Sequence, residues 1–305
     1  MKQNAFGQEI PGIPEAIQNP VVKAYILRTL TSVIKNLGIE SPNVLAQQVL
    51  EIAESSNTIE SYEKTTHALL ESKGVTADKV AETLSGRADL IYTQIKKYCT
   101  GKTVLDLGCG DGKVGEILAR SEKTVTLADV YKHPYVDETG LEFILFDQGE
   151  EIPTKKKFDT TLVLTVLHHS SNPLQTLRDA KRLTKKGGKI IVLESVYGIG
   201  KDQNANNYGK CSTEMADDFK SLNTEDQRFA NVFFDHFYNR VIHYSEDAKN
   251  KVNVPFNFRQ PERKDSWTEL FEKEGLNQIA LDYLGIDQPS VPEYHTLHVL
   301  EVKND

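Results

Sequence analysis

The sequence is poor in cysteine and contains no long apolar run. Its three cysteines, Cys99, Cys109 and Cys211, are far apart and form no CxxC pair. This spacing disfavours a zinc ribbon or a disulfide framework and favours a reducing environment. The longest apolar stretches, such as residues 162–167, are far shorter than the roughly 20 residues that span a bilayer. The first residues also lack the apolar run of a secretory signal, so we expect a cytoplasmic protein without a membrane segment.

Positive charge is outnumbered by negative charge. The chain of 305 residues has 36 Lys and Arg against 44 Asp and Glu, which gives a formal net charge of −8. An acidic chain lacks the broad positive field with which proteins track a nucleic-acid backbone. We therefore expect a small-molecule partner and no nucleic acid. The sequence also lacks an HxH or HxxxH pair, and we expect no metal site.

Helical periodicity dominates the first part of the chain. Apolar residues recur at i, i+3 and i+4 over residues 21–37, and similar patterns follow at 44–53, 61–72, 76–84 and 88–98. No strand-like alternation interrupts them. We therefore expect residues 1–85 to form a helical lid or cap domain.

Short β-branched runs alternate with helical stretches from Lys102 onward. The candidate strands are residues 103–107, 124–129, 143–147, 159–165, 189–195, 278–283 and 295–302. This alternation predicts an α/β fold with a doubly wound, mostly parallel sheet over residues 86–305. Residues 197–262 interrupt the pattern with a polar loop at 201–210 and an aromatic-rich helical stretch at 228–244. We interpret them as a segment inserted between the fifth and sixth strands.

The clearest motif is TVLDLGCGDGKVGEIL, residues 103–118. A buried strand leads into Gly108, Gly110 and Gly112 and then into a helix, which is typical of a turn that binds a nucleotide or cofactor. The same residues contain the dinucleotide pattern GxGxxG, with Asp129 placed 19 residues after Gly110. However, Asp106 lies inside the strand, where an acid suits a ligand with a cationic amino-acid portion better than a pyrophosphate.

The run D-L-G-C-G-D-G at residues 106–112 resembles motif I of the class I S-adenosylmethionine-dependent methyltransferases. Asp129 and Asp147, at the ends of the second and third strands, agree with that family in order and spacing. Residues 158–194 resemble its segment from the fourth to the fifth strand. The resemblance implies a Rossmann-like sheet of seven strands with the last one reversed. It also implies S-adenosylmethionine as methyl donor and S-adenosylhomocysteine as product.

The resemblance also assigns cofactor contacts. It places the amino-acid portion of the cofactor on the glycine loop, the ribose at the end of the second strand and the adenine at the end of the third. The residues implied are Arg87, Asp106, Gly108, Gly110, Gly112, Asp129, Val130, Asp147, Gln148, Thr165 and Leu167.

His168 and His169 follow the fourth strand at its carboxyl end, where open α/β sheets bind ligands. Because histidine changes charge near neutral pH, each is a candidate catalytic base, with His169 preferred. Alternatively, one of them packs on the cofactor or caps the next helix. Residues 165–168 read TVLH instead of the (D/N)PPY of DNA amino-methylating enzymes, which argues against that substrate.

Candidate acceptor-binding residues lie at the end of the fifth strand and in the insertion. They are Glu194, His236, Tyr238, Arg240 and His243. His236 and His243 are seven residues apart and are expected to share a helix face. Alternatively, Glu194 is a solvated strand-end acid, the aromatic residues belong to a core, and Arg240 faces solvent.

We therefore expect a methyltransferase that moves a methyl group to a hydroxyl or amine of a small molecule by in-line displacement. One alternative is a methyltransferase acting on tRNA or rRNA through a basic patch formed only in three dimensions. A second is a protein of the same fold that binds the cofactor without methylating. Two further alternatives are an NAD-dependent oxidoreductase and a non-catalytic protein that docks through its helical domain.

Overall fold

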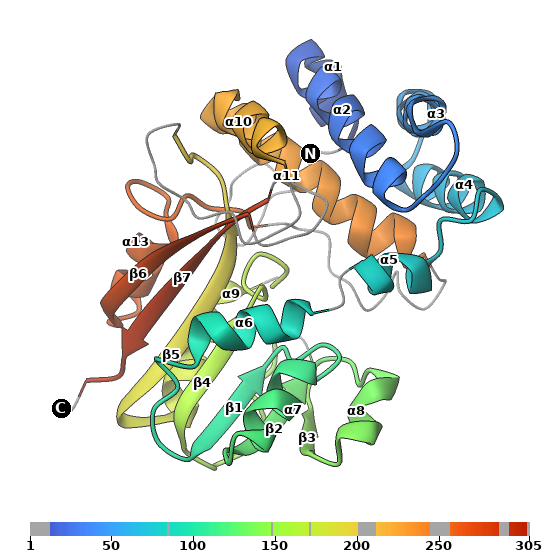
Figure 1. Ribbon diagram of the computed structural model, residues 1–305. Helices are drawn as coiled ribbons and strands as arrows, with labels where there is room; N and C mark the ends of the chain where they lie inside the picture. Colours follow the sequence, from blue (N-terminus) through green and yellow to red (C-terminus); the bar gives the residue numbers. More distant parts are fainter. Residues whose placement is uncertain are drawn as a thin grey trace. The chain divides into compact units, whose positions relative to one another are not determined.

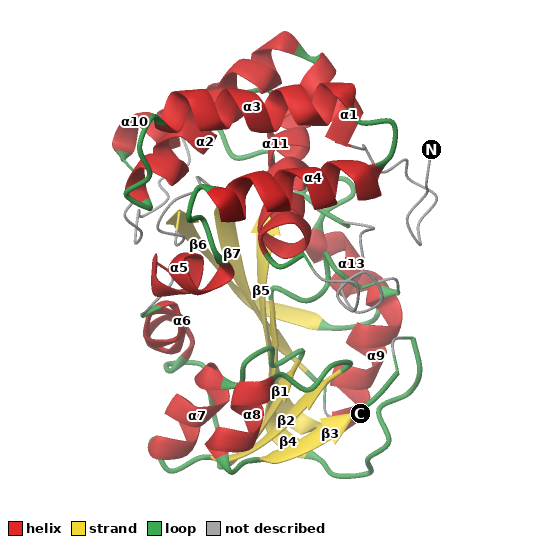
Figure 2. Ribbon diagram, turned by 90° about the vertical axis from the view of Figure 1, so that its right-hand side faces the viewer, coloured by secondary structure: helices red, strands yellow, loops and turns green. Residues whose placement is uncertain are grey.

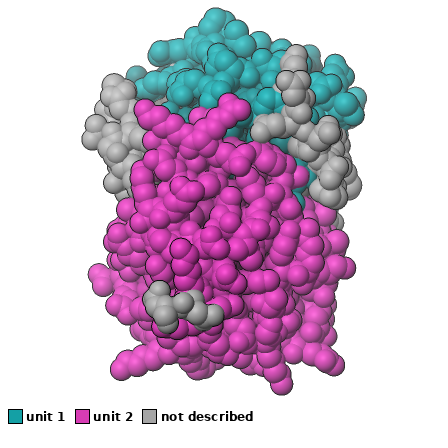
Figure 3. Space-filling view, turned by 90° about the vertical axis from the view of Figure 1, so that its left-hand side faces the viewer, with its two compact units in different colours: residues 1–85, 196–258, 284–294 teal, residues 86–195, 259–283, 295–305 magenta. Residues whose placement is uncertain are grey.

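The computed structural model describes residues 13–83, 86–147, 149–170, 172–200, 212–244, 257–286 and 293–303. The chain forms two compact units, which Figure 3 colours separately. The helical unit comprises residues 1–85, 196–258 and 284–294. The sheet unit comprises residues 86–195, 259–283 and 295–305. The expected polar loop at 201–210 lies outside the described residues.

The helical unit combines N-terminal helices with helices of the inserted segment. Its elements are α1 (Ile13–Gln18), α2 (Pro20–Asn36), α3 (Pro42–Ser55), α4 (Ile59–Ser72), α5 (Ala77–Thr83), α10 (Thr213–Ser221), α11 (Thr224–His236) and the π-helix η1 (Phe237–Ile242). Figure 1 shows α11 and α10, in orange, beside the blue α2. Several helices begin at a side-chain cap. Asn19, for example, accepts a hydrogen bond from the Val21 N–H at the start of α2.

The core of the helical unit is shared by the two parts of the sequence. The ring of Tyr25 in α2 lies 6.0 Å from that of Phe219 in α10 and 6.4 Å from that of Phe234 in α11. All three rings are buried, which makes the inserted helices part of the same apolar core as α2.

The sheet unit contains a seven-stranded sheet in the order β3-β2-β1-β4-β5-β7-β6. The strands are β1 (Thr103–Leu107), β2 (Thr124–Asp129), β3 (Glu142–Leu145), β4 (Phe158–Leu164), β5 (Thr184–Val196), β6 (Asn277–Ile286) and β7 (Tyr294–Glu301). The pairs β1–β2, β1–β4, β2–β3 and β4–β5 are parallel. The end of β7 meets the start of β5, where Val302 exchanges hydrogen bonds with Gly187 and Gly188, so β7 runs antiparallel to β5.

Helices cover both faces of this sheet. They are α6 (Arg87–Ile95), α7 (Lys113–Arg120), α8 (Pro134–Thr139), α9 (Pro173–Leu183) and α13 (Trp267–Lys273). Figure 2 shows α6 and α7 on one side of the strands and α9 and α13 on the other. The expected doubly wound, mostly parallel sheet of seven strands is confirmed. None of the helices described here has both the length and the apolar character needed to cross a membrane.

Among the strand bounds that differ from expectation are those of β3 and β5. β3 ends at Leu145, so Asp147 lies beyond the strand and not at its last residue. β5 begins at Thr184 and includes Gly187 and Gly188, which resemble a helix stop in the sequence. The reason is that the Gly187 N–H donates to the Val302 carbonyl oxygen at 2.8 Å. This sheet pairing is long-range, and local helix-stop signals do not report it.

Candidate functional site

The loop between β1 and α7 is built around three glycines with left-handed backbone angles. The φ values are +74° at Gly108, +53° at Gly110 and +76° at Gly112. A Cβ atom on Gly108 would lie 2.3 Å from Val166 Cγ2, whereas one on Gly110 would meet no atom within 4 Å. The loop therefore needs glycine at 108 because another segment packs on it. At Gly110 the backbone borders open space that a ligand can occupy.

Asp129 ties the end of β2 to this loop. One carboxylate oxygen accepts a hydrogen bond from the Gly110 N–H at 2.9 Å, and the other accepts one from the Val130 N–H at 2.7 Å. Burial raises the pKa of Asp129, and the backbone N–H groups oppose that rise. The predicted ribose-binding acid is thus held at the edge of the glycine loop.

Asp106 is a buried acid whose bonding capacity is only partly used within the described residues. Its side chain is 2% exposed, and among the described residues its Oδ2 atom has no hydrogen-bond partner. Burial, followed by the charges of Asp129 and Asp111, raises the pKa of Asp106 to about 7, and a hydrogen bond from the Gly115 N–H opposes this rise. A buried carboxylate with an unused oxygen suits a cationic ligand group such as an ammonium.

Arg87 is a basic residue of the sheet unit, to which Asp106 also belongs. It is the first residue of α6, which packs against α7. In the described part of the chain, its Nε atom is buried without a hydrogen-bond partner. A guanidinium with an unused donor suits a carboxylate. Asp106 and Arg87 thus give the sheet unit one unused acidic oxygen and one unused basic donor among the described residues.

The segment after β4 is held by Glu194 at the end of β5. One oxygen of Glu194 accepts hydrogen bonds from the N–H groups of Val166 at 3.0 Å and Leu167 at 2.6 Å. The other oxygen lies 2.5 Å from Nδ1 of His168. The side chains of Glu194, Leu167 and His168 are 0%, 0% and 2% exposed. These values exclude the alternative that Glu194 is a solvated strand-end acid.

His169 lies in a more open position than His168. The two rings are 4.1 Å apart between centroids, and His169 is half-buried. Thr165, at the start of the segment, has φ of +56° and is also half-buried. Beyond β3, Asp147 is exposed. Gln148 lies outside the described residues.

Two of the residues predicted in the insertion, Arg240 and His236, contact Glu63 in α4. Arg240 Nη2 donates to Glu63 Oε2 at 3.1 Å, and His236 Nε2 lies 3.0 Å from Glu63 Oε1. His236 is buried whereas His243 is exposed, so the expectation that they share a helix face is wrong. The reason is η1, because a π-helix holds more residues per turn and rotates the following side chains away.

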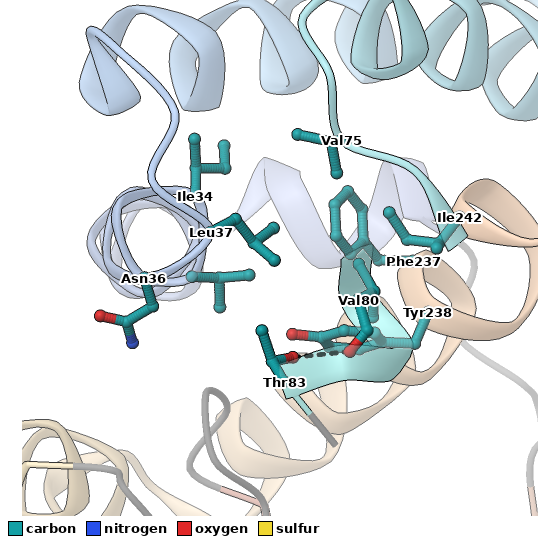
Figure 4. A pocket seen from close by; sticks show the side chains of 10 residues that line it. Ile34, Asn36, Leu37, Val75, Val80, Thr83, Phe237, Tyr238 and Ile242 are labelled. Carbon is teal, nitrogen blue, oxygen red and sulfur yellow. Dashed lines mark hydrogen bonds between the residues drawn. The ribbon is translucent and has the colours of Figure 1, made fainter. Parts of the chain in front are cut away.

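Tyr238 lines an apolar pocket inside the helical unit. Figure 4 shows the pocket between α2, α5 and η1. Its walls are Val33, Ile34, Asn36, Leu37, Val75, Val80, Thr83, Phe237, Tyr238 and Ile242. The pocket has a volume of about 10 Å³, room for about one water molecule, so it is far smaller than a small-molecule site.

The sequence-based prediction misses two residues that hold these segments in place, Val166 and Glu63. Val166 packs on Gly108, yet it reads as an ordinary apolar residue after a strand. Glu63 is 1% exposed on α4. The signal for Glu63 is its spacing, because it precedes the buried Thr66 and Leu70 by three and seven residues and so lies on the apolar helix face.

Comparison with known proteins agrees with this geometry. A family model described as a methyltransferase domain matches residues 88–281, more than half of the chain. A ubiquinone biosynthesis O-methyltransferase of Actinobacillus pleuropneumoniae serotype 5b (strain L20) is 33% identical over 104 residues, which cover 30% of this chain and 44% of that protein. One of the same name from Coxiella burnetii (strain Dugway 5J108-111) is 34% identical over 111 residues, which cover 33% of this chain and 47% of that protein. The chain thus spans less than half the length of these relatives.

Solved methyltransferases also align with the structure. One is the 1,6-didemethyltoxoflavin-N1-methyltransferase of Burkholderia thailandensis, crystallised with 1,6-didemethyltoxoflavin and S-adenosylhomocysteine. It aligns at 14% identity and a TM-score of 0.43 over 73% of this chain and 79% of that one. With the family model matched across the glycine loop and the strands on either side of it, the chain belongs to the class I methyltransferases that use S-adenosylmethionine.

Proposed function

We propose that the protein transfers a methyl group from S-adenosylmethionine to a hydroxyl of a small-molecule acceptor. The observation that carries the proposal is Asp106, a buried carboxylate with an unused oxygen beside a glycine loop that borders open space. The names of the relatives, which are O-methyltransferases, support a hydroxyl acceptor over an amine.

The residues of the sheet unit divide the work of cofactor binding. Asp106 and Arg87 would hold the ammonium and carboxylate of the amino-acid portion, and Asp129 would hold the ribose hydroxyls. When bound, the cofactor supplies an activated methyl group on a sulfonium, so the protein mainly has to position the acceptor and exclude water.

His169 is the residue that we assign to proton removal. A hydroxyl that gains a methyl group must lose its proton, and a neutral imidazole accepts that proton at a ring nitrogen. His169 is preferred to His168 because it is half-buried, whereas Nδ1 of His168 faces the Glu194 carboxylate. In the helical unit, Tyr238 stays a candidate for acceptor recognition on the sequence-based prediction.

Ligand-dependent stability tests cofactor binding. S-adenosylmethionine or S-adenosylhomocysteine at about 100 times its dissociation constant should stabilise the protein by about 2.7 kcal/mol, a Tm increase of several degrees. NAD serves as the control ligand and should leave Tm unchanged. Stabilisation by NAD and by neither sulfur compound would contradict the assignment.

The His169→Gln variant tests the assigned base. Transfer of a radiolabelled methyl group to a panel of phenols, alkylamines and bulk tRNA identifies the acceptor class, and phenols are expected to be labelled. With the labelled acceptor, the variant should lose at least a hundredfold in kcat while its affinity for S-adenosylhomocysteine stays within about twofold. Wild-type kcat in the variant would remove His169 from this role.

A further inference from the structure

We infer that Glu194 is a positioning residue that holds the segment after β4 against the glycine loop, with His168 as its hydrogen-bond partner and not as a base. This inference rests on the proposed function, since it assigns a role in holding the same cofactor site. Three donors converge on the one carboxylate: the N–H groups of Val166 and Leu167 and Nδ1 of His168, at 3.0, 2.6 and 2.5 Å.

The segment has a conformation that needs such a partner. Thr165 adopts φ of +56°, which is rare for a residue with a branched side chain. Its own N–H still donates to the Leu193 carbonyl oxygen of β5 at 2.6 Å, and the positive φ then turns the chain out of the strand. The next two N–H groups then point at Glu194, which is fully buried. Without the carboxylate these buried donors would lose the acceptor that pairs them.

Val166 connects the segment after β4 to the glycine loop, because its side chain packs against Gly108. Its side chain occupies the space beside Gly108, where a Cβ would come within 2.3 Å of Val166 Cγ2. On the other side, the N–H groups of Gly108 and Cys109 are fixed by the Ala128 carbonyl oxygen at 2.8 and 3.2 Å. The loop is therefore held between the end of β2 and Val166. Loss of Glu194 should release Val166 and loosen the loop that binds the cofactor.

The same geometry determines how His168 is used. Glu194 already accepts hydrogen bonds from two N–H groups, and in the proposed arrangement Nδ1 of His168 donates to its second oxygen. Nδ1 is then not available to accept a proton from an acceptor hydroxyl, so a basic role could act only through Nε2, and the His168 variants below test that role. His168 is also 2% exposed, as expected for a side chain that serves the loop.

Substitution of His168 separates positioning from catalysis. The side-chain amide of Asn places an N–H donor near the position of Nδ1 but is not a base. His168→Asn should therefore keep kcat and the affinity for S-adenosylhomocysteine within about threefold of wild type, whereas His168→Leu should weaken that affinity by at least tenfold. If His168→Asn loses a hundredfold in kcat with unchanged affinity, His168 is a base and the inference is overturned.

Substitution of Glu194 tests the carboxylate itself, with affinity for S-adenosylhomocysteine measured by calorimetry. Glu194→Ala should weaken the affinity at least tenfold, and Glu194→Gln should weaken it less, because the amide oxygen still accepts from Val166 and Leu167. Asp179→Asn is the matched control, since Asp179 in α9 is an equally buried acid paired with Arg182 at 2.7 Å. The control should lower Tm and leave the affinity unchanged.

The outcomes distinguish a failure of the inference about Glu194 from a failure of the proposed function. A folded Glu194→Ala protein that binds S-adenosylhomocysteine like wild type overturns the inference and leaves the proposed function intact. Wild-type protein that does not bind S-adenosylhomocysteine overturns the proposed function instead. If Glu194→Ala does not fold, Glu194→Gln and the two His168 variants decide the question, because each keeps part of the hydrogen-bond set.

Discussion

The affinity for the cofactor should depend on pH through the ionisation of Asp106. Its pKa is raised to about 7 by burial and by the neighbouring charges of Asp129 and Asp111. An ammonium group favours the ionised carboxylate, so a proton must leave Asp106 when the ligand binds at lower pH. Affinity for S-adenosylhomocysteine should be constant above pH 7 and weaken up to tenfold per pH unit below it. Calorimetry between pH 5.5 and 8.5 measures this slope, and Asp106→Asn should abolish it.

The same residue has the opposite effect on the stability of the ligand-free protein. The folded-state pKa of Asp106 lies above the unfolded value of about 3.9. The native state therefore binds the proton more tightly, and the free energy of unfolding falls as pH rises from about 4 to above 7. Asp106→Asn should raise the ligand-free Tm at pH 8 while it weakens the cofactor complex at least tenfold. A lower ligand-free Tm in the variant would contradict the assigned burial penalty.

Two glycines of the loop should respond differently to alanine. Gly108→Ala places a Cβ 2.3 Å from Val166 Cγ2, whereas Gly110→Ala meets no atom within 4 Å. Both positions carry the left-handed penalty of roughly 1–2 kcal/mol, but only Gly108→Ala adds a collision. We expect Gly108→Ala to lower the ligand-free Tm by several degrees more than Gly110→Ala does. Both variants should bind S-adenosylhomocysteine more weakly, and equal Tm losses would argue against the packing at Gly108.

At the scale of elements, Asp159 joins the starts of β4 and β1. One oxygen accepts hydrogen bonds from the N–H groups of Lys102 at 2.9 Å and Thr103 at 2.8 Å, and the other pairs with Lys185 at 2.7 Å. Lys185 and then Thr103 hold the pKa of Asp159 well below its usual range. The resulting stability is present above the unfolded pKa of about 3.9 and is lost as pH falls below it. Asp159→Asn should cost about 1–3 kcal/mol at pH 7 by thermal unfolding, and its deficit should shrink as pH falls from about 4 towards 2.

Elements whose pattern is local are predictable from the sequence. The bounds of β1 and β2 match expectation because each is a buried apolar run next to glycine or turn residues. The glycine loop and the role of Asp106 as a buried acid follow from the same run. The π-helix η1 is not predictable, because its apolar spacing resembles that of an α-helix. The hydrogen-bond partners of Glu63 and Glu194 are not predictable either, because they depend on packing between segments distant in sequence.

At the scale of the whole molecule, buried polar pairs join the N-terminal helices to the insertion. Asn19 donates to Asp226 at 2.7 Å, and Arg240 donates to Glu63 at 3.1 Å. Removing one member of a buried charged pair leaves the other without compensation, at a cost of about 3–5 kcal/mol. Glu63→Leu should therefore destabilise the protein strongly, and Glu63→Leu with Arg240→Leu should be less destabilising than the sum of the two. Denaturant unfolding of all four proteins measures this coupling, and strict additivity would contradict the pairing.

The interleaving of the two units has a consequence for synthesis. The chain leaves the helical unit after residue 85 and returns to it at residues 196 and 284. On the ribosome, α2 therefore emerges long before α10 and α11, whose aromatic rings complete its core. During that interval α2 can pack on α1 and α3 but lacks α10 and α11, while much of the sheet unit is still being made. Domains that are contiguous in sequence mature in order of emergence, whereas here α2 gains its last packing partners only after residues 86–195 of the sheet unit have been made.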